Sequence, residues 1–247
     1  MTYLFNTFIF QPFYNCFVFL IHWLPFLDVG VIVIIFTIIV KIILLPLSVK
    51  ASKAQIQMRG VEKDLAEIKL KYKDNKEEQS KKTIEYYKEK GINPFAGIFI
   101  LLIQIPIILG LYRVFLKSGL PKITTTLLYP FIVAPVSINM MFLGLINIAG
   151  KSVILALIAG LSTYFQIGLA TGSAGSQKNQ PTTPGMQQDI AKAMNTQMKY
   201  FFPILVAFIS YSISAALALY WITSNVFSIV QEIWIKKKYH KTPPIVV

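Results

Sequence analysis

Charged side chains are scarce in this sequence, since only 14% of the 247 residues are Asp, Glu, Lys or Arg. A soluble domain normally carries about 25% charged residues, so too little polar surface is available here to cover a water-soluble globule. Hydrophobic residues make up 55% of the chain and gather in long runs. The composition therefore excludes an ordinary soluble protein and places the chain among integral membrane proteins.

Cysteine and histidine are almost absent. The single cysteine, Cys16, has no second cysteine with which to form an internal disulfide. The two histidines, His22 and His240, lie in terminal segments, and the sequence contains no Cys/His cluster and no Gly-rich phosphate loop. We therefore expect no metal, no cofactor and no enzymatic activity. A serine–lysine peptidase is also disfavoured, because no serine lies four residues from the one lysine of the first apolar run, Lys41.

The net charge of +13 is unevenly distributed along the chain. Residues 1–30 contain no Lys or Arg, whereas residues 50–90 contain twelve basic and eight acidic residues. The basic residues lie beside apolar runs, so the positive-inside rule and anionic lipid explain them most simply. Binding of ribosomal RNA by the charged loop stays open as an alternative.

The apolar runs and the polar segments between them divide the chain into nine parts. We predict an outer interfacial amphipathic helix (1–28), a first span (29–49), a cytoplasmic helical hairpin (50–92), a second span (93–116), an extracytoplasmic, partly embedded segment (117–151), a third span (152–170), a flexible cytoplasmic loop (171–198), a fourth and a fifth span (199–235) and a basic cytoplasmic tail (236–247). The fold class is accordingly all-α: a polytopic membrane protein with a five-span helical core.

Several of these boundaries depend on particular residues. The N-terminal segment lacks the basic n-region of a signal peptide, and Gln11, Asn15 and His22 fall near one helical face. The second span is expected to open at Asn93 and Pro94, a cap followed by a first-turn proline. Residues 127–149 are apolar but hold two prolines, so we predict no span there.

The hairpin and the last two spans carry further signals. Apolar residues repeat at 4-3-4 spacing in the first hairpin arm: Ala54, Met58, Val61, Leu65, Ile68 and Tyr72. The turn of the hairpin is predicted at Asp74 and Asn75. The face of the second arm that packs against this seam, here called the answering face, is expected to contain Thr83, Ile84 and Tyr87. Serines at 210, 212 and 214 predict the break between the last two spans. Because basic residues concentrate in the hairpin, the loop and the tail, we expect the N-terminus outside and the C-terminus in the cytoplasm.

Lys41 is the only charged residue of the first span. A charge at such a depth costs about 2.5–3.5 kcal/mol on insertion scales. Its ammonium group either snorkels to the headgroups or faces a wet cavity inside the helix bundle. Glu232 is the one acidic residue within a predicted span, and it lies near the inner end of the last span, so the wet cavity is favoured over a buried ion pair. The other polar residues of the spans, Gln104, Gln166, Asn225 and Gln231, either bond to neighbouring helices or line one groove with Lys41. Tyr220 and Trp221, usually interfacial anchors, fall inside the last span.

Four sequence blocks carry a resemblance to a known family. They are VKIILLPLSVKASKAQIQM at the end of the first span, GINPFAGIFILLIQIPIILGLYRVF in the second, STYFQ in the third and ALALYWITSNVFSIVQ in the last. In this order they resemble the YidC/Oxa/Alb family of membrane protein insertases, over about residues 3–238. The chain is similar to the short bacterial form, which has no large extracytoplasmic domain.

The resemblance implies a membrane protein insertase of the bacterial inner membrane. It implies a hydrophilic groove that receives polar segments of nascent membrane proteins and uses neither nucleotide nor metal. Lys41 matches the family's positive residue, usually Arg, while Gln166 and Trp221, with Tyr220 before it, match other groove positions. Further partners implied are the lipid bilayer, the ribosome through the tail and hairpin, and the Sec translocon. A small-solute or anion transporter or channel using Lys41, and a structural scaffold, are the alternatives; no internal repeat supports the transporter.

Overall fold

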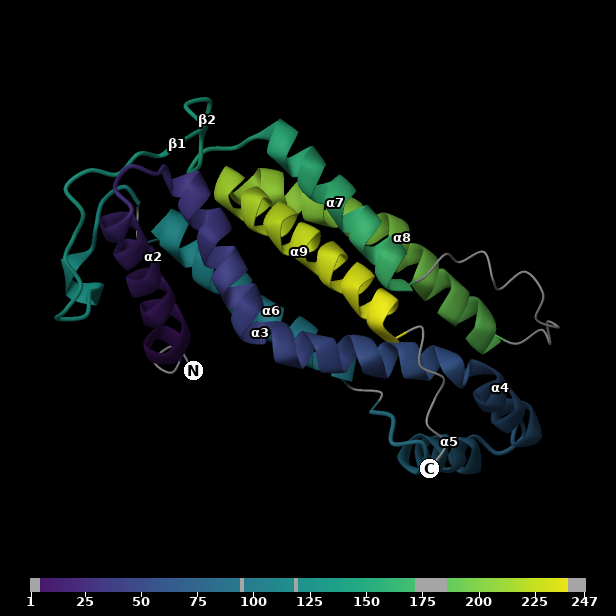
Figure 1. The fold of residues 1–247 in the computed structure, drawn as a ribbon. Helices are drawn as coiled ribbons and strands as arrows, with labels where there is room; N and C mark the ends of the chain where they lie inside the picture. Colours follow the sequence, from purple (N-terminus) through teal and green to yellow (C-terminus); the bar gives the residue numbers. More distant parts are fainter. Residues whose placement is uncertain (1–4, 94–95, 118–119, 172–185, 240–247) are drawn as a thin grey trace. The chain divides into compact units, whose positions relative to one another are not determined.

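The computed structural model describes residues 5–93, 96–117, 120–171 and 186–239 and is mostly helical (Figure 1). The chain forms two compact units: Met1–Ile42 with Pro106–Ile233, and Ile43–Ile105 with Trp234–Val247. The elements in chain order are η1 (Asn6–Phe10), α2 (Gln11–Trp23), α3 (Val29–Gly60), α4 (Glu62–Lys71), α5 (Lys76–Glu89), α6 (Ala96–Tyr112), η2 (Arg113–Lys117), η3 (Thr125–Leu127), β1 (Met141–Phe142), β2 (Ile146–Asn147), α7 (Val153–Thr171), α8 (Met186–Ile213) and α9 (Ala215–Tyr239).

The helical prediction is confirmed, although the short hairpin of β1 and β2 was not predicted. In the described part of the chain, two helical stretches are long and apolar enough to cross a membrane, Val29–Met58 and Val153–Ala170. Two shorter apolar helices cover Ile103–Phe115 and Lys199–Ile213. The five-span count stays a prediction, and so do the positions of the segments relative to the membrane.

Two helix boundaries differ from the predicted segment boundaries. α3 continues past residue 49 to Gly60, because residues 50–59 hold Lys, Ala, Gln and Met, which favour helix, and no Gly or Pro. α8 begins at Met186, so the loop predicted for 171–198 is wrong for its last thirteen residues, which are also free of Gly and Pro. Residues 172–185 of that loop, and Pro94 of the predicted second-span cap, lie outside the described residues.

Helices α4 and α5 form a hairpin in the smaller unit. Asn75 caps α5 by accepting a hydrogen bond from the Glu78 amide at 3.1 Å, at the predicted turn. All six residues of the predicted apolar seam are buried or half-buried. Ile84 is 55% exposed and does not belong to the answering face. The Tyr86 hydroxyl instead donates a hydrogen bond to Asp64, which turns the side of α5 that carries Thr83 and Tyr87 toward α4.

The bond between Tyr86 and Asp64 predicts a pH dependence of the hairpin. The hydrogen bond to Asp64 favours the neutral phenol and raises the pKa of Tyr86 to about 12. Because the pKa is higher in the folded state, the stabilisation is complete below about pH 10, the ordinary pKa of tyrosine, and is lost as the pH rises toward 12. Tyrosinate absorbance is measured against pH for the wild type and for Tyr86→Phe, and the difference between the two curves is the titration of Tyr86. We expect that difference to have its midpoint near pH 12. In Asp64→Asn the Tyr86 phenol should titrate closer to 10, and an ordinary pKa of Tyr86 in the wild type would contradict the bond.

In the larger unit, α2 binds the backbone of the segment that follows α6. Asn15 is 1% exposed, and its amide donates to the Leu127 carbonyl at 2.8 Å and accepts from the Tyr129 amide at 2.7 Å. Gln11 also donates to the Leu127 carbonyl, whereas His22 is exposed. Gln11 and Asn15 thus use the same face of α2, and Asn15 is buried there as a partner for backbone groups of the facing segment.

Residues 120–152, here called the linking segment, contain no α-helix. The Val29 amide at the start of α3 donates to the Asn139 carbonyl at 2.8 Å. At the start of α9, the amides of Ala215 and Ala216 donate to the carbonyls of Gly150 and Ile148, at 2.7 and 3.0 Å. The first amides of a helix lack intrahelical acceptors, and the linking segment supplies acceptors for both helices.

Two close approaches fix the packing in this unit. Gly30 lies against Phe142 of β1 so closely that a Cβ atom at Gly30 would be 2.3 Å from the ring. A Cβ atom at Gly160 would be 3.0 Å from the Pro203 carbonyl oxygen, so Gly160 lets α7 and α8 pack side by side (Figure 1). α8 ends at Ile213 and α9 begins at Ala215, where the serine pattern predicts a break.

Candidate functional site

The candidate site begins with Lys41, which lies on α3 in the larger unit. Its neighbours along the apolar first part of α3 are Ile, Val and Leu, so this charge lies among hydrophobic side chains of its own helix. Lys41 is half-buried, and its Nζ donates a hydrogen bond to Ser228 Oγ of α9 at 3.0 Å. The charge of the first apolar helix therefore meets the last helix of the chain.

The Ser228 hydroxyl is held in one orientation by its own helix. Ser228 Oγ donates to the Ser224 carbonyl one turn earlier at 2.9 Å, which leaves its lone pairs to accept from Lys41. An ammonium group has three N–H donors. Among the described residues Lys41 makes no ion pair and no second hydrogen bond, so two donors remain for water or for an incoming acceptor.

One face of α9 carries the polar residues of the site. Trp221, Ser224, Asn225 and Ser228 are spaced at i, i+3, i+4 and i+7, which places them on one side of the helix. Ser224, Asn225 and Trp221 are 4–8% exposed, so this face is packed against other parts of the unit. Tyr220 precedes Trp221 and is buried as well, at 1% exposure.

Asn225 links α9 to α7. Its Nδ2 donates to Ser162 Oγ at 2.9 Å and to Thr163 Oγ1 at 2.8 Å. Both hydroxyls donate in turn to the Ala159 carbonyl, at 2.9 and 2.8 Å, which orients them as acceptors. Because both N–H groups of the amide are used, Asn225 joins two helices at a hydrogen-bonded contact and has no side-chain donor left for a ligand.

The remaining predicted residues are placed differently. Gln166 is half-buried one turn beyond Ser162 and Thr163 on α7, and its side chain makes no hydrogen bond within the described part of the chain. Gln104 is half-buried in the smaller unit, whose position relative to Lys41 is not determined. The structure thus brings Lys41 to the α9 face that carries Trp221 and Asn225, and the groove role of each of these residues stays a prediction.

Sequence reasoning missed Ser228, Ser162 and Thr163. The helical spacing of Ser228 from Trp221 and Asn225 was a usable signal, since seven and three residues return a side chain to the same face. Ser162 and Thr163 begin the STYFQ block, which drew attention to Gln166 alone. Single hydroxyls are common in apolar helices, where they usually bond to their own backbone, so the sequence does not single them out.

No metal centre is evident in the described residues, which contain no group of three His, Cys, Asp or Glu side chains that could hold an ion. The polar groups of the site are one ammonium, hydroxyls and amides. This set can bind a carboxylate or water by charge and hydrogen bonding. Its members offer neither a general base paired with a nucleophile nor a set of metal ligands.

The comparisons with known proteins cover most of the chain. A family model described as 60Kd inner membrane protein matches residues 19–242. The chain is 31% identical over 209 residues to a protein of Fusobacterium nucleatum named membrane protein insertase YidC, covering 85% of this chain and 86% of that protein. It is also 31% identical over 218 residues to the protein of that name from Clostridium tetani, covering 88% and 86%.

One relative is much longer than this chain, and the chain matches only part of it. The membrane protein insertase YidC of Francisella philomiragia is 30% identical over 213 residues, which are 86% of this chain but 33% of that protein. The similarity to that protein is therefore confined to a third of its length, while it covers nearly all of the chain described here.

Proposed function

Because this chain belongs to the 60Kd inner membrane protein family and is a bacterial inner-membrane protein, we propose that it acts as a membrane protein insertase. Its clients are nascent membrane proteins, whose hydrophilic segments enter a polar, positively charged groove between helices. The groove then releases the apolar spans of the client into lipid. The curated relatives, which bear the name insertase, support this assignment.

The observation that carries the mechanism is the hydrogen bond from Lys41 to Ser228. It holds an ammonium group, half-buried on an apolar helix, with two N–H donors left for an acceptor. A client carboxylate would bind these donors through charge-assisted hydrogen bonds. Gln166 has an amide available beside this region, and Trp221 and Tyr220 supply an aromatic wall. Binding there gives an acidic segment a stable position part of the way across the bilayer, which lowers the cost of crossing.

The proposed topology has five spans, with the N-terminus outside and the C-terminus in the cytoplasm. α3 and α7 have the length and hydropathy for two spans. α6, α8 and the 25 residues of α9 supply the other three. The α4–α5 hairpin and the lysines at the end of α9 then face the cytoplasm, where they would meet the ribosome and the Sec translocon.

Site-specific photocrosslinking to a stalled nascent chain tests the proposal. Probes at Ser228 and Gln166 are expected to crosslink to a client with an acidic N-terminal tail. Probes at Val230 and Phe165 are matched controls, since they lie on the same two helices with 62% and 63% exposure, on faces suited to lipid. The crosslinks from Ser228 and Gln166 should exceed the controls several-fold.

Two results would contradict the proposal. Equal crosslinking from all four positions would mean that clients do not enter a groove. Ion flux through the purified protein in liposomes, without crosslinks to nascent chains, would instead support a transporter or channel with Lys41 as an anion site.

A further inference from the structure

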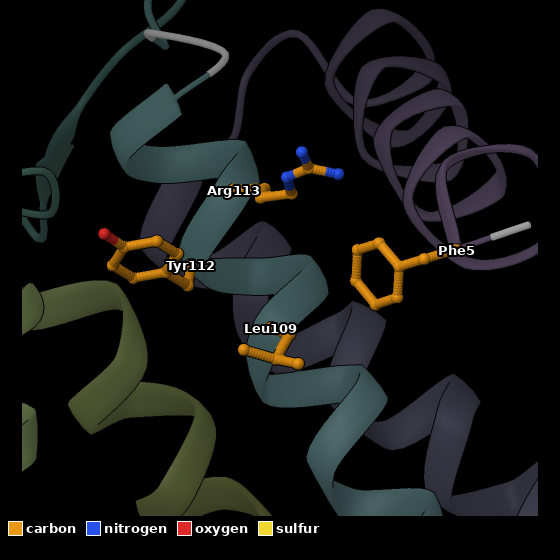
Figure 2. Close-up of a pocket in the computed structure, with 4 residues that line it drawn as sticks. All are labelled: Phe5, Leu109, Tyr112 and Arg113. Atoms are coloured by element: carbon orange, nitrogen blue, oxygen red, sulfur yellow. The ribbon is translucent and has the colours of Figure 1, made fainter. Parts of the chain in front are cut away.

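A cavity of about 220 Å³ lies beside α6, away from the Lys41 site. It is lined by Phe5, Leu109, Tyr112 and Arg113 (Figure 2). Phe5 faces α6 from the N-terminal segment, across from Leu109 and Arg113 (Figure 2). All of these residues belong to the larger unit. The lining is apolar apart from one guanidinium group and one phenol hydroxyl.

The guanidinium group of Arg113 is a cation without an acidic partner among the described residues. Its carbon lies 5.4 Å from the ring centre of Phe5 and 5.3 Å from that of Phe10. One N–H group donates to the side-chain oxygen of Asn6. Arginine has five N–H donors, so this neutral contact leaves most of them, and the whole charge, for a ligand. The site therefore holds a half-buried positive charge between two aromatic rings.

Arg113 and its partner Asn6 both lie in segments with an unusual backbone. η1 (Asn6–Phe10) and η2 (Arg113–Lys117) are both π-helices. π-Helical residues make up well under about 1% of known structures and are frequent at functional sites. The contact between Asn6 and Arg113 joins these two segments. Packing of apolar helices alone does not require two π-helices at one cation, which is a second and independent sign of a binding site.

We propose that this cavity binds an anionic phospholipid, with the phosphate on Arg113 and the first part of an acyl chain against Phe5 and Leu109. The planar fork of donors on arginine matches phosphate oxygens, and the phosphate supplies the charge that no described residue supplies. The apolar wall suits methylene groups, and Leu109 is 46% exposed, so the cavity is open to the surrounding lipid. In the proposed topology this end of α6 lies at the outer leaflet. The site is independent of client insertion.

Native mass spectrometry of the purified, delipidated full chain tests the proposal. The probes are phosphatidylglycerol, phosphatidylcholine with the same acyl chains, and glycerol phosphate. The wild type should retain phosphatidylglycerol at least tenfold better than Arg113→Gln, because the variant loses the charge-assisted hydrogen bonds to the phosphate. Arg113→Lys should fall between them. Lys122→Gln is the matched control, because Lys122 is an exposed cation of the linking segment, and it should leave binding unchanged.

A second variant keeps the test decisive if Arg113→Gln disturbs folding. Leu109→Trp fills the cavity from a partly exposed position and leaves the contact between Arg113 and Asn6 in place, so it should also lose phosphatidylglycerol while its thermal unfolding matches the wild type. Equal binding of phosphatidylglycerol and phosphatidylcholine would overturn the proposal. So would full binding by both variants, or glycerol phosphate competing as well as the intact lipid, which would reveal a free-anion site.

Discussion

Lys41→Glu is expected to abolish insertion of clients with acidic N-terminal tails, whereas Lys41→Arg is expected to support it. At about 8 Å and an effective dielectric constant near 20, one pair of unit charges interacts with about 2 kcal/mol. Reversing the sign of Lys41 therefore changes the energy of an acidic client segment by about 4 kcal/mol, or roughly a thousandfold in occupancy. Lys41→Ala removes only the attraction and should lie between the two. Depletion of the wild-type protein, rescue with each variant and measurement of single-span client insertion check the order.

A control variant and a client of opposite charge separate the electrostatic role of Lys41 from a general loss of function. Lys50→Glu changes an exposed lysine of the same helix, α3, and should rescue nearly as well as the wild type. A client whose acidic tail residues are replaced by lysine should recover insertion with Lys41→Glu, because the pair of charges is restored with opposite signs. Equal rescue by Lys41→Glu and the wild type for the acidic client would refute the electrostatic role.

Gly30→Ala is expected to destabilise the protein by about 1–3 kcal/mol, the range for overpacked sites. A Cβ atom at Gly30 would lie 2.3 Å from Phe142 Cδ2 and 2.8 Å from Phe142 Cβ. The second distance involves the base of the side chain, so a rotation of the ring alone does not relieve the clash. The strand must move, and with it the Asn139 carbonyl that accepts from the Val29 amide. Thermal unfolding in detergent measures the loss.

Gly168→Ala is the matched control for this prediction. Gly168 lies inside α7, and a Cβ atom there would meet nothing within 4 Å. Because alanine favours helix over glycine by about 1 kcal/mol, this variant should be neutral or slightly more stable. In the double mutant with Phe142→Ala, the effect of Gly30→Ala should largely disappear. Persistence of the full loss without the Phe142 ring would show that the clash is not its cause.

The helices were predictable because their signals are local. Long apolar runs around residues 29–49 and 152–170, and the serines before Ala215, mark elements that the structure also has. The extension of α3 to Gly60 and of α8 back to Met186 was missed for one reason. Polar composition predicts a separate helical hairpin from residue 50 and a loop up to residue 198, although residues 50–59 and 186–198 favour helix and contain no Gly or Pro.

The site was predictable only to the level of single residues. Lys41 stands out by the cost of a charge in an apolar helix, but its acceptor, Ser228, is 187 residues away in sequence. Asn225 is predicted in a groove, a role that stays a prediction, but its bonds to Ser162 and Thr163 of α7 have no local signal in the sequence. Asn15 and Gln11 are predicted to lie near one helical face, but their common acceptor, the Leu127 carbonyl, is more than a hundred residues away in sequence. Each of these outcomes depends on tertiary pairing, which helical periodicity does not encode.

The linking segment also determines how the Lys41 site can open. It ties the first turn of α3 at Val29 and the first turn of α9 at Ala215 to residues only eleven apart, Asn139 and Gly150. The two helices are therefore held together at their first turns, where the linking segment binds, and these ends act as a pivot. Lys41 and Ser228 lie twelve and thirteen residues along these helices, about 18–20 Å from the pivot at 1.5 Å per residue. A tilt of a few degrees at the pivot is enough to part the ammonium from the hydroxyl, and in the proposed mechanism a client displaces Ser228 in this way while the pivot stays intact.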